Sequence, residues 1–255
     1  MSPSFLSQHH SIPVVFENVY GLTKFKNGEE NIQNHIENRF RDIGYTVKSK
    51  ILYASDFGVP QRRNRLFIVG NRNGIDFEFP KEFDYSVSVD EAISDLPVLG
   101  NGEIQMKGEY TVPFEQASPY AQLMRKKSKA PTQNIVSRNK DYVVERYKYI
   151  GQGENWSSIP DRLMENYADK KRCHSGIYKR LIGGKPSVVI SNYRKSMLIH
   201  PHQDRGLSVR EAARLQSFPD HFIFEGPVSY VQQQIGNAVP PLLAKAVMKK
   251  ILTYK

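Results

Sequence analysis

The chain has little of several features, and each shortage excludes a class of protein. Its 255 residues include one cysteine, Cys173, so no internal disulfide can form, and a reducing cytoplasm is the expected compartment. No apolar run approaches the length that spans a membrane, so we expect no membrane attachment. The first residues lack a basic stretch followed by a long apolar one, and we therefore expect no export signal.

Negative charge is scarce in the middle of the chain. The formal net charge is +10, and it divides into −4 for residues 1–120, +11 for residues 121–205 and +3 for residues 206–255. A basic excess of this kind predicts a face that binds a polyanion, most simply nucleic acid. The alternative is a solvated, lysine-rich surface. A hydrophobic fraction of 39% is enough for a sizeable core in one or two domains.

The first hundred residues predict an α/β arrangement. Residues 14–16 form a continuous apolar run, which is typical of a parallel strand covered on both faces. Glu17 follows at the carboxyl end of that strand, where open α/β sheets bind their ligands. A helix is predicted at residues 30–43, and further strands at residues 45–52 and 66–70.

Three arginines, Arg62, Arg63 and Arg65, lie in the short stretch between the second and third predicted strands. Their guanidinium groups must meet solvent, an acid or a phosphate, because burial of an unpaired charge costs too much. This stretch is therefore a candidate functional loop.

The chain changes character after Gly70. A short helix is predicted at residues 91–96 with Asp90 as its cap. Residues 100–205 predict a smaller, irregular, mainly β domain, in which residues 188–190 are the clearest strand. The return to the first domain is expected near residues 200–201.

Two blocks mark the last fifty residues. In residues 207–220, Ser208 and Glu211 form a capping box that predicts a helix at residues 209–216. In residues 234–241, Gly236 and Asn237 predict a tight turn, and the two prolines that follow open another helix. The apolar face of that helix is predicted to hold Leu243, Ala246, Val247 and Ile251.

These two blocks, in this order and spacing, resemble the ninth and tenth motifs of the DNA (cytosine-5) methyltransferase family. Residues 16–19, Phe-Glu-Asn-Val, resemble its Glu-Asn-Val motif, and residues 61–65 resemble its Gln-Arg-Arg-x-Arg motif. The resemblance implies an α/β fold: the second half of a doubly wound, Rossmann-like methyltransferase sheet with an inserted, mainly β target-recognition domain. The implied domains are residues 1–99 and 206–255 for the catalytic part and residues 100–205 for target recognition.

The chemistry of the family assigns roles to individual residues. Methylation of cytosine C5 needs a thiolate at C6, a carboxyl group at N3, a donor at O2 and a pocket for a flipped base. The resemblance implies that Glu17 contacts N3, that Arg65 approaches O2, and that Arg63 supports the catalytic loop and phosphates. Part of the S-adenosylmethionine pocket is implied at Asn237, Ala238 and Val239. DNA contacts are implied at Arg125, Lys126, Lys127, Arg172, Tyr178 and Arg180.

Two parts of the family pattern do not occur in this sequence. There is no glycine-rich cofactor turn before Glu17 and no Pro-Cys pair, and Cys173 lies far downstream in a basic stretch. The resemblance therefore implies the smaller subunit of a split methyltransferase for double-stranded DNA, inactive alone. A heterodimer partner would carry the catalytic cysteine and the cofactor glycines. A role beside a restriction endonuclease is an expectation from the family. The alternatives are a non-catalytic or degenerate DNA-binding fragment and, more distantly, half of an RNA methyltransferase.

Overall fold

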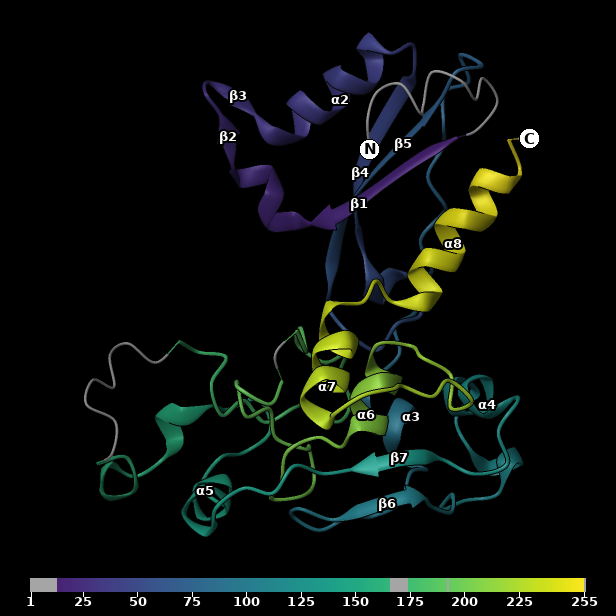
Figure 1. Cartoon of the computed structure of the whole chain (residues 1–255). Coiled ribbons are helices and arrows are strands. Elements are labelled where there is room, and N and C mark those ends of the chain that lie inside the picture. The colour runs from purple at the N-terminus through teal and green to yellow at the C-terminus, as the bar shows by residue number, and fades with distance from the viewer. Residues whose placement is uncertain (1–12, 166–173, 192, 255) are drawn as a thin grey trace.

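The computed structural model describes residues 13–165, 174–191 and 193–254, and these form two lobes (Figure 1). The sheet lobe holds the strands β1 (Val14–Val19), β4 (Thr46–Tyr53) and β5 (Asn64–Asn71) with the helices α2 (Ile32–Asp42) and α8 (Pro241–Leu252). The second lobe holds the other, mostly short helices and a two-stranded ribbon.

The main sheet has three strands in the order β1-β5-β4, and both pairings are antiparallel. The strands predicted at residues 45–52 and 66–70 are confirmed as β4 and β5. The run at residues 14–16 forms β1, but the expectation of a parallel strand covered on both faces is wrong. In the described part of the chain β1 pairs only with β5, and Val15 is 37% exposed. β1 is therefore an edge strand with partly open faces.

The side chains of a strand alternate between the two faces of the sheet. One face of this sheet packs against α2 and the other against α8. Ser49 of β4 faces α2, and its Oγ donates to Oε1 of Glu37 at 2.7 Å. Leu52 and Phe67 face the other side and share a hydrophobic cluster with Leu243 of α8. Val247 and Ile251 join the same cluster and Ala246 packs against it, so the apolar face predicted for the last helix is confirmed.

Helix α2 begins where a polar side chain caps it. The side-chain oxygen of Asn31 accepts a hydrogen bond from the backbone N–H of Gln33 at 2.8 Å. The helix predicted at residues 30–43 is thus confirmed apart from its ends. Before it, β3 (Glu30–Asn31) pairs with β2 (Lys26–Asn27) in a small hairpin.

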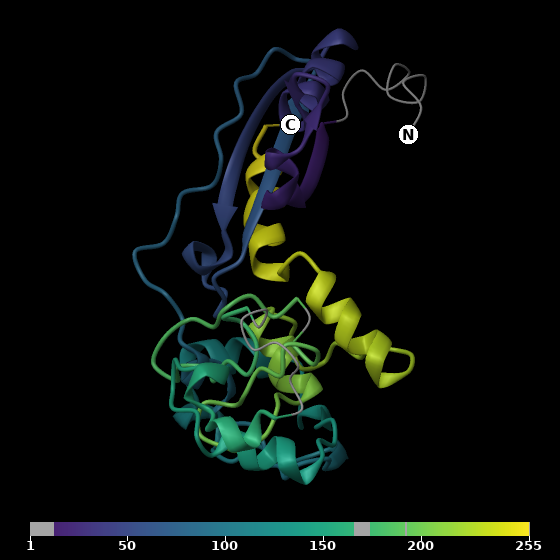
Figure 2. The same cartoon turned by 90° about the vertical axis from the view of Figure 1, so that its left-hand side faces the viewer.

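A strap without regular structure, residues 72–88, connects the lobes and runs beside β4 (Figure 2). Two ion pairs of 2.9 Å attach it to that strand: Lys48 with Asp76, and Lys50 with Glu82. All four side chains are largely exposed, so these ion pairs contribute little to the stability of the fold.

The second lobe is built around α6 (Val209–Leu215), whose residues are all buried. It packs against α3 (Val89–Ile93), β7 (Thr132–Ile135) and α7 (Val228–Asn237). The predicted capping box of Ser208 and Glu211 is confirmed. The remaining strand and helices of the lobe are β6 (Ile104–Lys107), α4 (Pro119–Arg125) and α5 (Asp141–Tyr147). The 3₁₀ helices of both lobes are η1 (Tyr20–Lys24), η2 (Ala54–Phe57), η3 (Phe114–Gln116), η4 (Trp156–Ser158) and η5 (Asp161–Leu163).

Several expectations for the second lobe are wrong. Where residues 100–205 are described, β6 and β7 are the only strands, so this region is not mainly β. Residues 188–190 form no strand and have no ladder partner; the nearest bridge is the isolated one between Gln61 and Ser187. The short helix α3 is capped by Ser88, in a capping box with Glu91, and not by Asp90.

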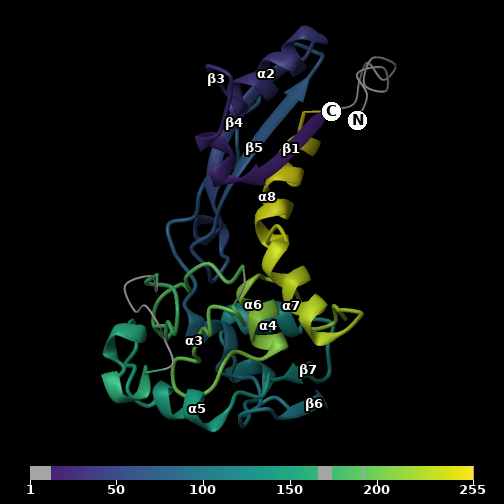
Figure 3. The ribbon, with the colours of Figure 1, turned by 60° about the vertical axis from the view of Figure 1, so that its left-hand side comes forward.

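The return to the sheet also comes later than expected. Residues 200–201 lead into α6, which stays in the second lobe, and only α8 reaches the sheet (Figure 3). Gly236 and Asn237 are the last residues of α7 and not a tight turn, whereas the helix predicted at the two prolines is confirmed as α8. No helix in the described ranges is long and apolar enough to cross a membrane.

Candidate functional site

The centre of the candidate site is an ion pair between Glu17 and Arg65. Glu17 lies opposite Phe67 and Val19 lies opposite Arg65, so alternation places Glu17 and Arg65 on the same face of β1 and β5. The Nε of Arg65 is 2.7 Å from Oε1 of Glu17. Burial raises the pKa of the Glu17 carboxyl, although Arg65 and Arg63 both act to lower it. This carboxyl group therefore holds a proton more readily than an exposed glutamate does.

Arg63 connects the arginine motif to the end of α7. Its side chain is only 2% exposed, and its Nη2 donates to the backbone oxygen of Gly236 at 2.7 Å. Its Nε and Nη1 are also buried, and no atom in the described part of the chain accepts a hydrogen bond from them. Burial and the charge of Arg65 lower the pKa of Arg63 to about 10, so it stays charged at neutral pH. Two charged N–H donors are therefore left for another group.

Two buried glutamines tie the same motifs together. Gln61 Nε2 donates to Oε1 of Gln216 at 3.0 Å and to the backbone oxygen of Leu215. Gln216 Nε2 in turn donates to the backbone oxygens of Ile235 at 2.6 Å and Ala238 at 3.4 Å. Sequence analysis gave these glutamines no role. The available signal was that each glutamine lies within one of the family-like motifs and directly follows an apolar residue, Pro60 or Leu215.

The segment that follows Lys185 lies between the arginine motif and α7. The backbone N–H of Arg62 donates to the oxygen of Ser187 at 2.8 Å, and the N–H of Ser187 donates to the oxygen of Pro60 at 3.0 Å. At the other end, a Cβ on Gly236 would lie 1.9 Å from the backbone oxygen of Ser191. Glycine is required at position 236 because any side chain would collide with this backbone.

The predicted cofactor residues lie beside Arg63, where α7 ends. Asn237 is exposed, and Ala238 and Val239 are half-buried in the link to α8. They offer one amide side chain and backbone polar groups, which suits one wall of a pocket for S-adenosylmethionine.

The ninth motif forms the interior of the second lobe. Arg214 is fully buried, and its Nε and Nη2 contact both carboxylate oxygens of Asp220 at 2.9 and 2.7 Å. Its Nη1 also contacts Asp95. Arg205 forms a second two-point pair with Glu211, at 2.9 and 2.7 Å. These residues hold the lobe together and are not exposed for catalysis.

Three of the predicted DNA contacts are contradicted by burial. Arg125 pairs with Asp95 at 3.4 Å, and its guanidinium lies 3.8 Å from the centre of the Tyr110 ring. Tyr178 is fully buried. Arg180 donates to four backbone oxygens and to the Asp204 carboxylate. These side chains hold the second lobe together, so none of them is free to contact a phosphate or a base.

The other predicted DNA contacts have a different outcome. Lys126 and Lys127 are exposed just after α4, so the prediction for them stands. Arg172, like Cys173, lies outside the described residues. Further exposed cations were not singled out by sequence analysis, because charge alone does not separate them from the buried ones. They include Lys129, Arg138, Lys140, Lys185, Arg194 and Lys195.

Solved structures share the fold. A candidate DNA modification methyltransferase encoded within an Escherichia coli prophage matches 98% of this chain and 72% of its own, with a TM-score of 0.70 at 23% identity. The methyltransferase EhMeth of Entamoeba histolytica matches 95% of this chain and 62% of its own, with a TM-score of 0.52 at 12% identity. The fold is therefore a mixed α/β, methyltransferase-like one.

Sequence similarity then defines the family. Residues 5–253 match the C-5 cytosine-specific DNA methylases, and the chain belongs to this family. It is 34% identical over 240 residues to Type II methyltransferase M1.HphI of Haemophilus parahaemolyticus, and 33% identical over 262 residues to M.DdeI of Desulfomicrobium norvegicum. These matches cover 93% and 94% of this chain but 56% and 62% of the relatives, so the chain spans less than two thirds of their length.

Proposed function

We propose that this chain supplies target recognition and part of the cytosine and cofactor pockets of a DNA cytosine-5 methyltransferase. The enzyme would transfer a methyl group to C5 of a cytosine flipped out of double-stranded DNA, in the setting of restriction and modification. The observation that carries the proposal is the 2.7 Å pair of Glu17 and Arg65, on one face of two neighbouring strands. The two side chains offer an acid and a cation side by side.

Cytosine presents N3 and O2 as neighbouring atoms on one edge, and this pair suits that edge. With a raised pKa, Glu17 would hold a proton and donate it to N3 as the ring takes up electrons. Arg65 would donate to O2 and stabilise the negative charge that develops there. The thiolate that adds to C6 would come from a partner chain, because the sequence has no Pro-Cys pair and its one cysteine, Cys173, lies far downstream of Glu17 in a basic stretch.

The partner would also complete two other features of the site. Arg63 has two buried N–H groups to spare, which suit carbonyl oxygens of a catalytic loop or a DNA phosphate. Asn237, Ala238 and Val239 would form one wall of the S-adenosylmethionine pocket, and the partner's glycine-rich turn would form the rest. Bound there, the cofactor supplies the sulfonium methyl group. The heterodimer and its cytoplasmic location are parts of the same proposal.

Within this frame the chain would divide between the family's two roles, with α3, α6 and α7 of the catalytic part packed in the second lobe beside the target-recognition residues. Residues 1–99 and 206–255 would complete a doubly wound methyltransferase sheet together with the partner. Residues 100–205 would be the target-recognition domain. The net charge of +11 in residues 121–205 supports this role for the segment. Lys126 and Lys127 are two of its exposed cations.

The test is transfer of a labelled methyl group to DNA. The chain alone should transfer none, and mixing it with a polypeptide that carries the Pro-Cys pair and the glycine-rich turn should restore transfer. Cys173→Ala should leave the restored rate unchanged. Transfer by the chain alone that Cys173→Ala abolishes would contradict the proposal. DNA binding without transfer in any mixture would favour the non-catalytic fragment.

A further inference from the structure

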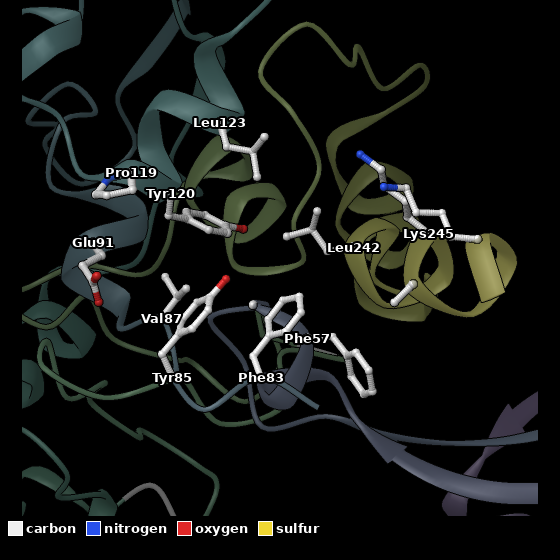
Figure 4. Close-up of a pocket in the computed structure, with 13 residues that line it drawn as sticks. Phe57, Phe83, Tyr85, Val87, Glu91, Pro119, Tyr120, Leu123, Leu242 and Lys245 are labelled. Atoms are coloured by element: carbon white, nitrogen blue, oxygen red, sulfur yellow. The ribbon is translucent and has the colours of Figure 1, made fainter. Parts of the chain in front are cut away.

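A cavity of about 480 Å³ lies at the junction of the two lobes (Figure 4), and neither Glu17 nor Arg65 lines it. Its walls come from η2, from the strap, from α3 and α4, and from α8. The volume lies in the range of small-molecule sites. None of the residues assigned to the cytosine or cofactor pockets lines it, so the proposed methyl transfer does not explain it.

Aromatic rings form one side of the cavity. Phe83 and Tyr85 of the strap are stacked, with ring centres 5.2 Å apart and an angle of 12° between the planes. Phe57 lies beside them, and Tyr120 faces them across the cavity (Figure 4). Phe83 is 46% exposed and Tyr85 is 57% exposed. Two stacked rings left open to solvent are a surface on which a planar group can bind.

Gly58 keeps this surface accessible. It ends η2 in the left-handed conformation, with φ +74°, which disfavours any other residue. A Cβ there would lie 3.5 Å from the Phe83 ring and would occupy space beside it. The glycine therefore serves both the backbone turn and the shape of the cavity.

The rim of the cavity is cationic. Lys245 and Lys249 are one turn apart on α8, both line the cavity and both are exposed. Neither forms an ion pair within the described ranges. The one carboxylate in the lining, Glu91, already accepts hydrogen bonds from the backbone N–H and the hydroxyl of Ser88 in its capping box. Two ammonium groups are thus available to an anion.

The cavity lies toward the opposite edge of the sheet from the β1 edge at which a partner is expected. η2 follows β4, the strand at the opposite edge of the sheet from β1. A polypeptide that pairs with β1 would leave the cavity open. Met248 and Leu252 are exposed on the same face of α8 as Lys245 and Lys249, because these positions are three and four residues apart. A partner that also covered this helix face would compete with a ligand for the lysines, so the site is open in the chain without its partner.

We propose that this cavity binds a planar aromatic anion of the nucleoside diphosphate class. The base stacks on Phe83 and Tyr85, and the phosphates lie against Lys245 and Lys249. The inference goes beyond the proposed methyl transfer and does not depend on it. Because both lobes contribute walls, the ligand bridges the strap and α8 to α4.

The test is calorimetric titration of the full chain with ADP, adenosine and inorganic pyrophosphate. ADP should bind at one saturable site. Adenosine, which lacks the phosphates, and pyrophosphate, which lacks the base, should each bind about tenfold or more weakly than ADP. Tyr85→Ala should weaken ADP and adenosine by about tenfold, as loss of one stacking partner typically does. Lys245→Gln with Lys249→Gln should weaken ADP roughly fivefold and leave adenosine unchanged, because exposed charge pairs are individually weak.

Lys250→Gln is the matched control. Lys250 lies on the same helix, but its Nζ pairs with Glu78 at 3.3 Å and does not line the cavity. ADP binding should not change in this variant. Pyrophosphate binding as tight as ADP, an unchanged affinity in Tyr85→Ala, or the absence of saturable ADP binding would each overturn the proposal.

Discussion

Glu17 and Arg65 show how burial can outweigh a neighbouring cation in its effect on the pKa of a carboxyl group. The cation lowers the pKa of Glu17, but burial of the carboxyl raises it by more, so the net shift is upward. The arginine loses hydration in the same place, and burial lowers its pKa as well. Both groups are thus partly desolvated. A cytosine edge that presents N3 and O2 side by side could form a hydrogen bond with each of them.

A substitution at Glu17 separates the catalytic role from a structural one. In the reconstituted enzyme, Glu17→Gln should slow the single-turnover methyl transfer by about 10²–10⁴-fold, the usual contribution of general acid catalysis. DNA affinity should change little, because one side chain of the pocket makes few of the DNA contacts. Glu29→Gln, the same change at an exposed glutamate in the turn between β2 and β3, is the comparison. A near-normal rate in Glu17→Gln would show that Glu17 only supports the sheet.

Because His200 is buried, we expect the stability of the second lobe to depend on pH. Burial lowers its pKa to about 4, despite the nearby Glu211, so the folded protein keeps the imidazole neutral. The unfolded chain binds a proton near pH 6.5. The free energy of unfolding should therefore fall as the pH drops from about 6.5 to 4, by roughly 3 kcal/mol from this residue. Urea unfolding of His200→Asn should show a shallower fall across that window.

His202 provides the control for this experiment. It is a neighbouring histidine, but it is exposed and pairs at the surface with Asp90 at 2.8 Å. His202→Asn should keep the pH dependence of the unmodified chain. An equal slope in His200→Asn and the unmodified chain would contradict the burial of a neutral imidazole.

Individual residues also show where sequence reasoning stops. The arginine motif and Glu-Asn-Val together indicated that Glu17 and Arg65 act at one site, and the structure brings them into contact. The same reasoning could not separate Arg125 and Arg180, which are buried among protein partners, from Lys126, which is exposed. Whether a cation faces water depends on contacts with distant residues, and these are not visible in local composition.

The packing of α7 depends on a close contact between its backbone and a neighbouring segment. The backbone of Gly236 touches that of Ser191, and its oxygen also accepts the hydrogen bond of Arg63. Gly236→Ala should lower the free energy of unfolding by about 1–3 kcal/mol or more, because backbone and not a flexible side chain blocks the new methyl group. Gly184→Ala, where no atom lies within 4 Å of the added Cβ, should change it by less than about 1 kcal/mol. Equal stability of the two variants in urea would contradict the contact.

Elements were predictable where the signal is local. The capping box at Ser208 and the proline start of α8 lie within a few residues of the helices they begin, and both are confirmed. Strand direction is not a local property, so the apolar run at residues 14–16 suggested a parallel strand although β1 is antiparallel to β5. The segment at residues 188–190 looked like a strand because it is apolar, but it packs between two motifs and lacks a ladder partner.

At the scale of the whole molecule, the basic segment predicts salt-dependent DNA binding. Affinity should fall steeply with salt concentration, because each neutralised phosphate releases bound counterions. Lys126→Gln with Lys127→Gln should reduce the slope of log affinity against log salt by about one to two. Lys48→Gln with Lys50→Gln removes the same charge from the sheet lobe, where both lysines pair with acids, and should leave the slope unchanged. Equal slopes in the two double variants would place the phosphate contacts elsewhere.

The exposed edge of the sheet predicts association. In the part of the chain that is described, β1 pairs with β5 on one side only, and its Val15 and Val19 are exposed. Met248 and Leu252 of α8 are exposed as well. An unpaired strand edge and an apolar helix face both favour contact with another chain. The chain alone should therefore self-associate, and a polypeptide carrying the Pro-Cys pair should convert it into a heterodimer. Sedimentation velocity measures both, and Val15→Lys, which places a charge on that edge strand, should weaken both. A monomer that ignores the added polypeptide would show that β1 is a tolerated free edge and would favour an independent DNA-binding module.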